Sequence, residues 1–266
     1  MTIRGQQIVL PIQAPNAPGA VELNISPADR IVTGMSFIHR AMQPKSLTAL
    51  SGGGVSGYCR ASEEPLIQKG ADPSVLKLEI VGGKPALAFS NYFGVGSLAF
   101  QPGSASKSYT QVIVVNVSDP TDRVNFLFSY TDETPIASVL RYDITSDSPD
   151  AKKFIAYGSS NNPAHAAADR PAGTWAVLVV DYDDVTRKVS IAVNQVDTFA
   201  EQIKSVNHLV EAESYFEVGY HGSSNGLRDA KVGDLYVFNQ SLRNSPASMA
   251  KLSQLVAALK TEYGIV

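Results

Sequence analysis

The chain has 266 residues, a formal net charge of −3, 44% hydrophobic residues and 18% charged residues. This composition can form a sizeable core and argues against disorder, and because Lys and Arg form no basic block, nucleic acid is not an expected partner. The only cysteine, Cys59, can form no internal disulfide, so packing has to stabilise the fold.

Residues 1–74 are rich in Pro and Gly and contain few periodic segments. The run SGGGVSG (51–57) lacks the Gly-Lys-Ser/Thr of a phosphate-binding loop, so we expect a flexible loop. The N-terminus has no apolar core of signal-peptide length, and no apolar run approaches the roughly 20 residues that cross a membrane. We therefore expect a soluble protein made in the cytoplasm, and whether it stays there is open. We expect an irregular N-terminal arm or docking region over 1–74 and a separate domain over 75–266.

From residue 76 onward, short strand-like runs alternate with turn residues, which is typical of a sandwich or barrel. A nearly continuous run of Val and Ile at 111–117 indicates a strand that is covered on both faces. Further strands are expected at 76–80, 86–89, 125–130, 139–144, 154–157, 216–220 and 231–238.

The stretch GTWAVLVVDYDDVTRKVSIAVNQ (173–195) predicts a β-hairpin whose two strands differ in depth. Both faces of 175–182 are apolar, as in a central strand buried on two sides. Polar turn residues follow at 183–187. In 188–194 apolar residues alternate with polar or small ones, which favours a half-buried strand nearer an edge or an outer face.

The C-terminal end predicts an amphipathic helix over 245–263. Ser245 can cap the helix, Pro246 suits its first position, and Gly264 is a natural stop. One helical face is apolar and carries Met249, Leu252, Leu255, Leu259 and Tyr263.

The hairpin motif, the stretch YFEVGYHGSSNGLRDAKVGDLYVFNQSL (215–242) and the terminal helix together resemble the concanavalin A-like (laminin-G-like) lectin/glucanase superfamily. The resemblance covers roughly 76–266. It departs from the family pattern at Gln195, where the usual Gly of an Asn-Gly turn is replaced. The resemblance implies an all-β fold, an antiparallel jelly-roll sandwich, but it fixes no function, because lectins, hydrolases and structural modules share the superfamily.

Carboxylates are the first candidates for chemistry, because laminarinase-type hydrolases of this superfamily carry Glu-x-Asp-x-(x)-Glu on one strand. Glu211, Glu213 and Glu217 share one face, but no Asp lies between them, and we interpret them as a solvated strand entrance. Asp181 and Asp183 lie at a hairpin tip, where acidic residues are ordinary turn formers; calcium binding there is the alternative. We expect no metal and no cofactor.

The loop YHGSSNG (220–226) is the better candidate for ligand binding. Its members supply an aromatic ring, an imidazole, hydroxyls and an amide, the groups that stack on sugars and bond their hydroxyls; the alternative is a plain polar turn. The predicted ligand-binding residues are Tyr220, His221, Ser223, Ser224 and Asn225. The four histidines show no metal-ligand spacing, and Cys59 is expected to be an inert thiol.

Together these features lead us to expect a non-enzymatic structural or adhesion module, a bacteriophage virion protein of the decoration, collar or tail-fibre type. Its expected partners are other virion subunits, contacted through the arm, and a cell-surface glycan; a homo-oligomer and assembly in the host cytoplasm are expected. Two alternatives stay open. One is a glycan-processing enzyme with a degenerate carboxylate motif that uses Glu211, Glu213 or Glu217, and the other is a monomeric carbohydrate-binding module.

Overall fold

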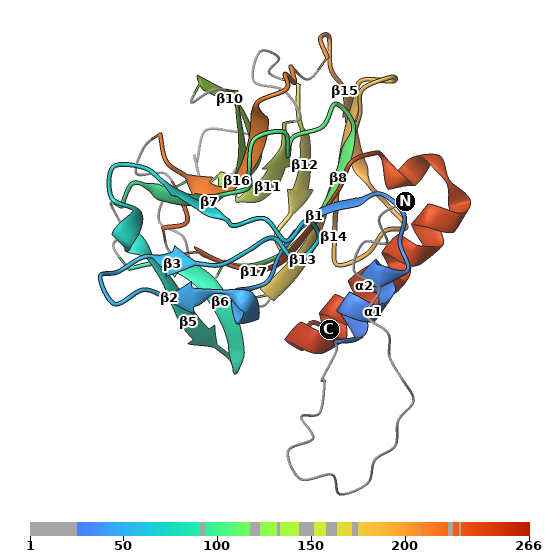
Figure 1. Ribbon diagram of the computed structural model, residues 1–266. Helices are drawn as coiled ribbons and strands as arrows, with labels where there is room; N and C mark the ends of the chain where they lie inside the picture. The colour runs from blue at the N-terminus through green and yellow to red at the C-terminus, as the bar shows by residue number, and fades with distance from the viewer. Residues whose placement is uncertain are drawn as a thin grey trace, which may run out of the picture.

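Two antiparallel sheets face each other across a shared apolar core, and two helices cover the far side of the first sheet (Figure 1). The computed structural model describes residues 26–90, 94–117, 123–131, 134–143, 152–157, 164–171, 175–207, 209–222, 226–228 and 230–266. The fold class expected from the sequence, an all-β sandwich with a C-terminal helix, is confirmed. Within the described residues, no helix is both long and apolar enough to span a membrane.

The first sheet has the strand order β15-β14-β13-β8-β17-β6-β5, and β1 also pairs with β17. Its strands are β1 (Ile38–Met42), β5 (Leu76–Val81), β6 (Lys84–Phe89), β8 (Tyr109–Val117), β13 (Trp175–Asp183), β14 (Lys188–Val193), β15 (Ala200–Ile203) and β17 (Ala230–Phe238). The centre of this sheet is buried on both faces, because its inner side chains enter the core between the sheets and its outer ones lie under the helices.

The second sheet has the order β12-β11-β10-β9-β16-β7-β4. Its strands are β4 (Ile67–Lys69), β7 (Gly96–Ala99), β9 (Val124–Thr131), β10 (Thr134–Asp143), β11 (Lys153–Ala156), β12 (Ala166–Asp169) and β16 (Ser214–Tyr220). We call the face of the second sheet that points away from the first sheet the outer face.

The predicted hairpin is present as β13 and β14, and all nine residues of β13 are buried as expected. The expected half-burial of β14 is wrong. Val189 and Ile191 enter the core between the sheets, while Ser190 on the other side lies under Arg243, whose Nη1 donates a 2.5 Å hydrogen bond to its hydroxyl. The predicted position nearer an edge is confirmed, because β14 lies between β13 and the edge strand β15.

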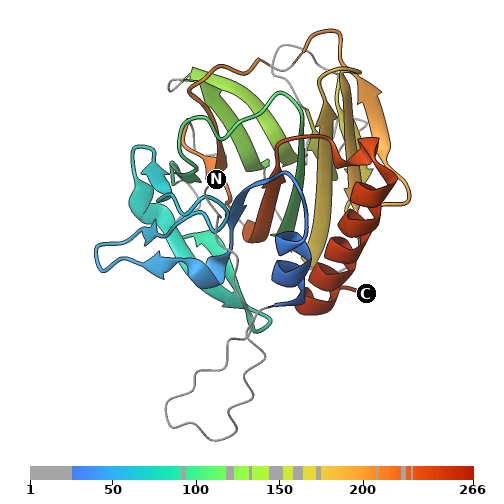
Figure 2. The ribbon, with the colours of Figure 1, turned by 45° about the vertical axis from the view of Figure 1, so that its right-hand side comes forward.

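Helix α2 (Pro246–Tyr263) confirms the predicted C-terminal helix. The hydroxyl of Ser245 caps its N-terminus, and Gly264 ends it in the left-handed conformation, with φ 66°. Figure 2 shows the red helix running along the yellow strands of the first sheet. Trp175 is the first residue of β13, and its ring packs against Tyr263 of this helix, with the ring centroids 4.9 Å apart.

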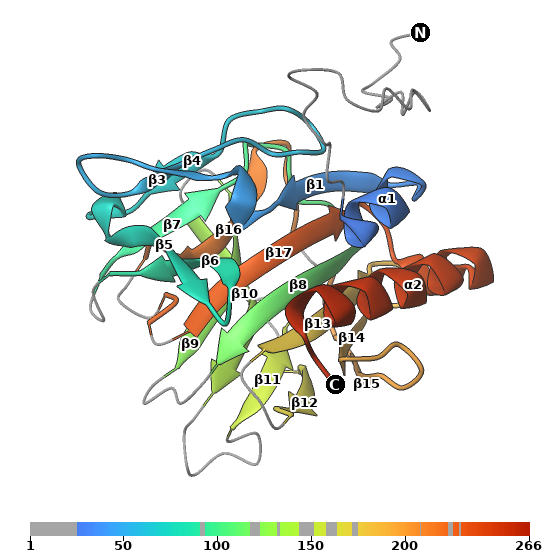
Figure 3. The ribbon, with the colours of Figure 1, turned by 90° about the horizontal axis from the view of Figure 1, so that it is seen from below.

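The expected boundary between an arm and a domain at residue 74 needs correction. Within 26–74, β1 pairs with β17 of the first sheet and β4 pairs with β7 of the second. Helix α1 (Pro27–Thr33) lies beside α2 (Figure 3). This region also contains η1 (Pro44–Ser46), η2 (Pro73–Val75) and a small hairpin of β2 (Thr48–Ala49) and β3 (Val55–Ser56). The run SGGGVSG (51–57) supplies part of the hairpin turn and includes β3 itself. The short helix η3 (Leu242–Asn244) precedes α2. Residues 26–74 are therefore part of the sandwich.

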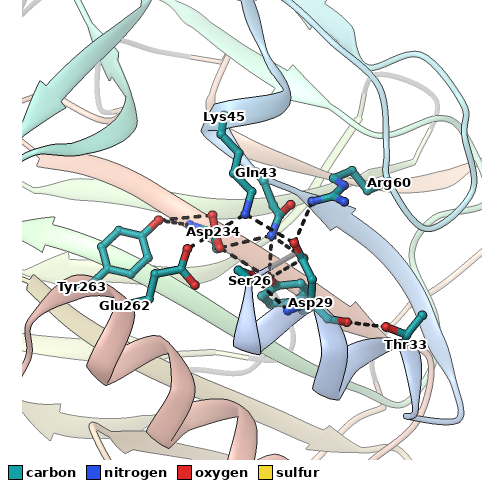
Figure 4. A network of polar contacts seen from close by, with 10 residues as sticks. Ser26, Asp29, Thr33, Gln43, Lys45, Arg60, Asp234, Glu262 and Tyr263 are labelled. Atoms are coloured by element: carbon teal, nitrogen blue, oxygen red, sulfur yellow. Dashed lines mark hydrogen bonds and ion pairs between the residues drawn. The ribbon is translucent and has the colours of Figure 1, made fainter. Parts of the chain in front are cut away.

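A buried polar network ties α1 to β17 and α2 (Figure 4). The amide Nε2 of Gln43 donates to Asp29 of α1 at 2.7 Å and to Asp234 of β17 at 3.2 Å. Tyr263 of α2 donates its hydroxyl to Asp234 at 3.2 Å, and Arg60 pairs with Asp29 at 3.1 Å. The network fixes the N-terminal segment to the C-terminal helix, which local sequence patterns do not indicate.

Candidate functional site

Strand β16 carries the candidate site on the outer face of the second sheet. Its residues Phe216 and Val218 enter the core between the sheets, so Tyr215 and Glu217 point to the outer face. Tyr215 pairs with Tyr130 of β9 across the ladder, and their stacked rings have centroids 5.6 Å apart.

The carboxylate of Glu217 is the centre of a small hydrogen-bond network. It is fully buried and accepts a hydrogen bond from the hydroxyl of Ser97 at 2.7 Å. Its Oε2 also lies 2.6 Å from Nδ1 of His221, and the backbone N–H of His221 donates to Oε1 at 3.2 Å. Burial raises the pKa of Glu217, and the hydrogen bonds from His221 and Ser97 oppose this effect. The carboxyl group therefore fixes the orientation of the imidazole.

The chain can fold back over Glu217 because β16 contains a glycine at a critical position. Gly219 has φ +89°, and a Cβ there would lie 3.2 Å from the backbone oxygen of Gly96 on the neighbouring strand. A residue with a side chain would be strained in this conformation. Tyr220 and His221 follow directly, so the glycine sets where their side chains leave the sheet.

His221 and three tyrosines form an aromatic cluster on the outer face. The imidazole of His221 stacks on Tyr130 with 4.2 Å between centroids, and Tyr220 lies 6.4 Å from the same ring. The ammonium of Lys69 lies 5.0 Å from the ring centre of Tyr215. Tyr130 and Tyr215 are buried, whereas Tyr220 and His221 are only partly buried. A ligand would therefore meet Tyr220 and His221 first.

The structure brings together part of the residue set predicted from the sequence. Tyr220 and His221 lie in one cluster, while Ser223, Ser224 and Asn225 lie outside the described residues. The interpretation of all three glutamates as solvated is wrong for one of them. Glu211 and Glu213 are exposed before β16 begins, but Glu217 is buried by Ser97 and His221.

Sequence reasoning missed Ser97, Tyr130 and Lys69, because they reach the site from β7, β9 and β4 through sheet pairing. The only local signal was the spacing of four residues between Glu217 and His221. Such a spacing is common by chance and has no special meaning at the end of a strand.

The other candidate residues have structural partners. Asp181 is buried and accepts hydrogen bonds from Thr110 at 2.6 Å and Ser241 at 2.9 Å, and burial raises its pKa to about 6. Asp183 accepts from the backbone N–H of Val185 within its turn at 3.1 Å. The part of the chain that the structure describes contains no group of three His, Cys, Asp or Glu side chains placed to hold a metal ion.

The remaining histidines and the cysteine lie elsewhere. Nε2 of His39 is 3.4 Å from the backbone oxygen of Gly103, and the ring of His165 lies 5.1 Å from that of Tyr157. His208 is outside the described residues. The backbone N–H of Ala41 donates to the buried Sγ of Cys59 at 3.3 Å. This thiol is packed inside the protein.

Comparisons with known proteins identify the fold alone. No protein-family model matches the sequence, and no match was found among curated proteins. The sialidase of Trypanosoma rangeli in complex with sialic acid aligns with a TM-score of 0.54 and 14% identity, over 86% of this chain and 33% of the sialidase chain. Domain 4 of AbnA, an extracellular GH43 arabinanase from Geobacillus stearothermophilus, in complex with arabinotriose, aligns with a TM-score of 0.52 and 14% identity, over 81% of this chain and 98% of that domain.

These matches correct the expectation of a non-enzymatic module. The sandwich has the fold found in structures of glycan-processing enzymes, a sialidase and an arabinanase, so the lack of a carboxylate motif was not sufficient reason to exclude enzymes. The chain spans about a third of the length of the sialidases that it matches. At 14% identity the likeness carries no active-site residue from those proteins to this one.

Proposed function

We propose that this chain is a glycan-binding sandwich domain of a glycan-processing protein, with its binding site at Tyr220 and His221 on the outer face of the second sheet. One observation carries the proposal. The imidazole of His221 is held between the Glu217 carboxylate, at 2.6 Å, and the ring of Tyr130, at 4.2 Å, next to the partly exposed Tyr220. Such a site is ordered before a ligand arrives.

The chemistry of this site suits a sugar. Aromatic rings such as that of Tyr220 bury the apolar face of a pyranose or furanose ring, and the tyrosine hydroxyl and the imidazole can bond its hydroxyl groups. Because Glu217 and Tyr130 restrict the imidazole of His221, little side-chain entropy is lost on binding. The complexes of the arabinanase domain with arabinotriose and of the sialidase with sialic acid support a glycan as the class of ligand.

Isothermal titration calorimetry on ligands selected with a glycan array tests the proposal. We expect Tyr220→Ala and His221→Ala each to weaken the affinity at least about tenfold, because each removes a direct contact worth about 1.4 kcal/mol or more. Phe37→Ala is the matched control, because Phe37 is an aromatic residue that is 47% exposed beside β1 of the first sheet. Absence of glycan binding, or equal losses in all three variants, would contradict the proposal.

A second candidate function, hydrolysis of the bound glycan, is favoured by the buried carboxyl group of Glu217. A carboxyl whose pKa is raised by burial and that lies beside an imidazole has properties of a general acid or base. Release of reducing ends from the bound glycan, lost in Glu217→Gln while the exposed-site variant Glu213→Gln retains it, would support hydrolysis. No release by the wild type would leave binding as the function.

The narrower expectations from the sequence stay predictions: a place in a phage particle, assembly in the host cytoplasm, and a homo-oligomer that contacts other virion subunits. Light scattering after size-exclusion chromatography checks the oligomer, for which we expect a mass that is a multiple of 28.4 kDa. A monomer at all concentrations would contradict it.

A further inference from the structure

Three carboxylates meet at the junction of α1, β17 and α2 (Figure 4). Asp29 comes from α1, Asp234 from β17 and Glu262 from α2. Within the described residues, the cations that lie within 4.0 Å of these carboxylates are Lys45 and Arg60. When all three carboxylates are ionised, the junction therefore carries more negative than positive charge.

The two cations pair with Asp29 and not with Asp234. Oδ2 of Asp29 lies 3.3 Å from the ammonium of Lys45 and 3.1 Å from Nη1 of Arg60. Lys45 also lies 4.0 Å from Oε1 of Glu262. Asp234 is only 2% exposed, and no cation of the described residues forms an ion pair with it. A buried carboxylate without a cation is costly, and uptake of a proton removes this cost.

Hydrogen bonds compensate the charge of Asp234 only in part. The hydroxyl of Tyr263 donates to Oδ1 at 3.2 Å, and Nε2 of Gln43 donates to Oδ2 at 3.2 Å. The same Nε2 lies 2.7 Å from Asp29 and 2.7 Å from the hydroxyl of Tyr236, so its two hydrogens face three oxygens. Oε1 of Gln43 is buried and has no hydrogen-bond donor within the described residues. Burial raises the pKa of both tyrosines, so neither titrates near neutral pH.

Protonation of Asp234 is coupled to the docking of α1. The pKa of Asp234 is raised from 3.8 to about 6, first by burial and then by the charge of Glu262; Lys45 lowers it, and Asp29 raises it further. When α1 moves away, the charge of Asp29 leaves with it and water reaches Asp234, so this pKa returns toward its usual value. The closed state is therefore stabilised at acidic pH, and this stabilisation is lost as pH rises through about 6.

The contacts that hold α1 in place are few. The helix has seven residues, and Ala28 and Val32 pack into the apolar cluster that contains Leu259 and Tyr263 of α2. A helix of this length is not stable in water by itself, so its position depends on these two side chains and on the polar junction. A change in the free energy of the junction therefore changes how often α1 detaches.

We propose that α1 is a pH-sensitive clasp, which stays docked on α2 at acidic pH and detaches more often at neutral pH, and that Asp234 is the group that titrates. Detachment exposes the apolar surface of α2 that Ala28 and Val32 cover. This inference does not depend on the proposed glycan site, because that site lies on the outer face of the second sheet and α1 lies against the first.

Hydrogen–deuterium exchange of the full chain, followed by mass spectrometry at pH 5, 6, 7 and 8, tests the inference. Each exchange rate is divided by that of the unstructured peptide at the same pH, so that only protection by the fold remains. We expect the protection of residues 27–33 to fall about tenfold from pH 5 to pH 8. Asp234→Asn is neutral at every pH, so its protection should change by less than about twofold. Asp181→Asn is the matched control, because Asp181 is buried with Thr110 and Ser241 instead, and it should keep the tenfold fall.

Three results would overturn the inference. The first is protection of residues 27–33 that is constant or rises with pH in the wild type. The second is a fall that survives in Asp234→Asn, and the third is an equal fall in peptides of β8, which would mean that the whole sandwich opens. If circular dichroism shows that Asp234→Asn is unfolded, Glu262→Gln replaces it. Removing this charge should move the midpoint of the fall to lower pH, and an unchanged midpoint overturns the inference.

Discussion

His221 Nδ1 lies 2.6 Å from Oε2 of Glu217, four residues earlier in the chain, and the same carboxylate oxygen accepts the hydroxyl of Ser97 at 2.7 Å. This relationship joins the end of β16 to β7. Glu217 is therefore buried, and its carboxylate holds the imidazole of His221, which we propose as a ligand contact.

Removing this carboxylate should destabilise the fold strongly. Glu217→Ala takes away the acceptor that Ser97 and His221 share, and we expect the free energy of unfolding to fall by about 2–4 kcal/mol. Glu213→Ala is the matched control, because Glu213 is exposed just before β16, and it should change the free energy by less than about 0.5 kcal/mol. Urea denaturation measures both. Equal losses of unfolding free energy in the two variants would show that the hydrogen bonds of Glu217 to Ser97 and His221 do not stabilise the fold.

The buried Asp181 makes stability depend on pH. Burial raises its pKa from 3.8 to about 6, so the folded state holds its proton up to a higher pH than the unfolded state does. The stabilisation is complete below the unfolded pKa and is lost as pH rises through about 6. We expect the difference in unfolding free energy, wild type minus Asp181→Asn, to fall by about 2 kcal/mol from pH 4 to pH 7.

Urea titrations of both proteins at pH 4, 5, 6 and 7 check this prediction. Asn can accept from Thr110 and donate to Ser241, so the variant keeps the local contacts of Asp181 without its charge. A difference that is constant with pH, or that grows as pH rises, would mean that Asp181 does not titrate as the buried geometry requires.

Two buried glutamines should respond in opposite ways to the same substitution. Neither side-chain atom of Gln111 has a hydrogen-bond partner within the described residues, so Gln111→Met should raise the free energy of unfolding by about 1–3 kcal/mol. Gln43 donates to Asp29 and Asp234, so Gln43→Met should lower it by about as much. Thermal unfolding measures the two signs. Destabilisation by both would indicate a partner for Gln111, such as an internal water.

The segment before residue 75 should be required for folding. A chain of residues 75–266 lacks β1 and β4, which pair with β17 and β7, and it exposes the apolar surface that α1 covers on α2. We expect a loss above about 5 kcal/mol relative to the full chain, because several buried side chains such as Met42 disappear at once. Circular dichroism with urea checks this. A stable, cooperative 75–266 chain would restore the boundary expected from the sequence.

Local patterns predicted the parts of this fold that local interactions decide. The apolar faces of 175–182 predict a central strand, and Ser245, Pro246 and Gly264 mark the ends of the terminal helix. These signals lie within a few residues of the element that they define. The sandwich class follows from them together with the spacing of the strands.

The rest depends on distant partners. β1 and β4 are short and carry no clear alternation, so local sequence patterns do not predict them. They are strands because they pair with β17 and β7, which lie more than 25 residues away in the sequence. Alternation correctly places Glu217 on the outer face. It says nothing of whether that face is covered, which depends on Ser97 from β7 and on the turn that Gly219 permits. The residues of the candidate site were therefore predicted only in part.

The proton resonances of the His221 imidazole, assigned by their loss in His221→Gln, provide the most direct measurement of ligand binding at this site. The full chain is titrated with the glycan that it binds most tightly on an array. We expect a saturable shift of the His221 resonances and none for His39 or His165, which lie outside the aromatic cluster. Saturable binding with an unmoved His221 would contradict it.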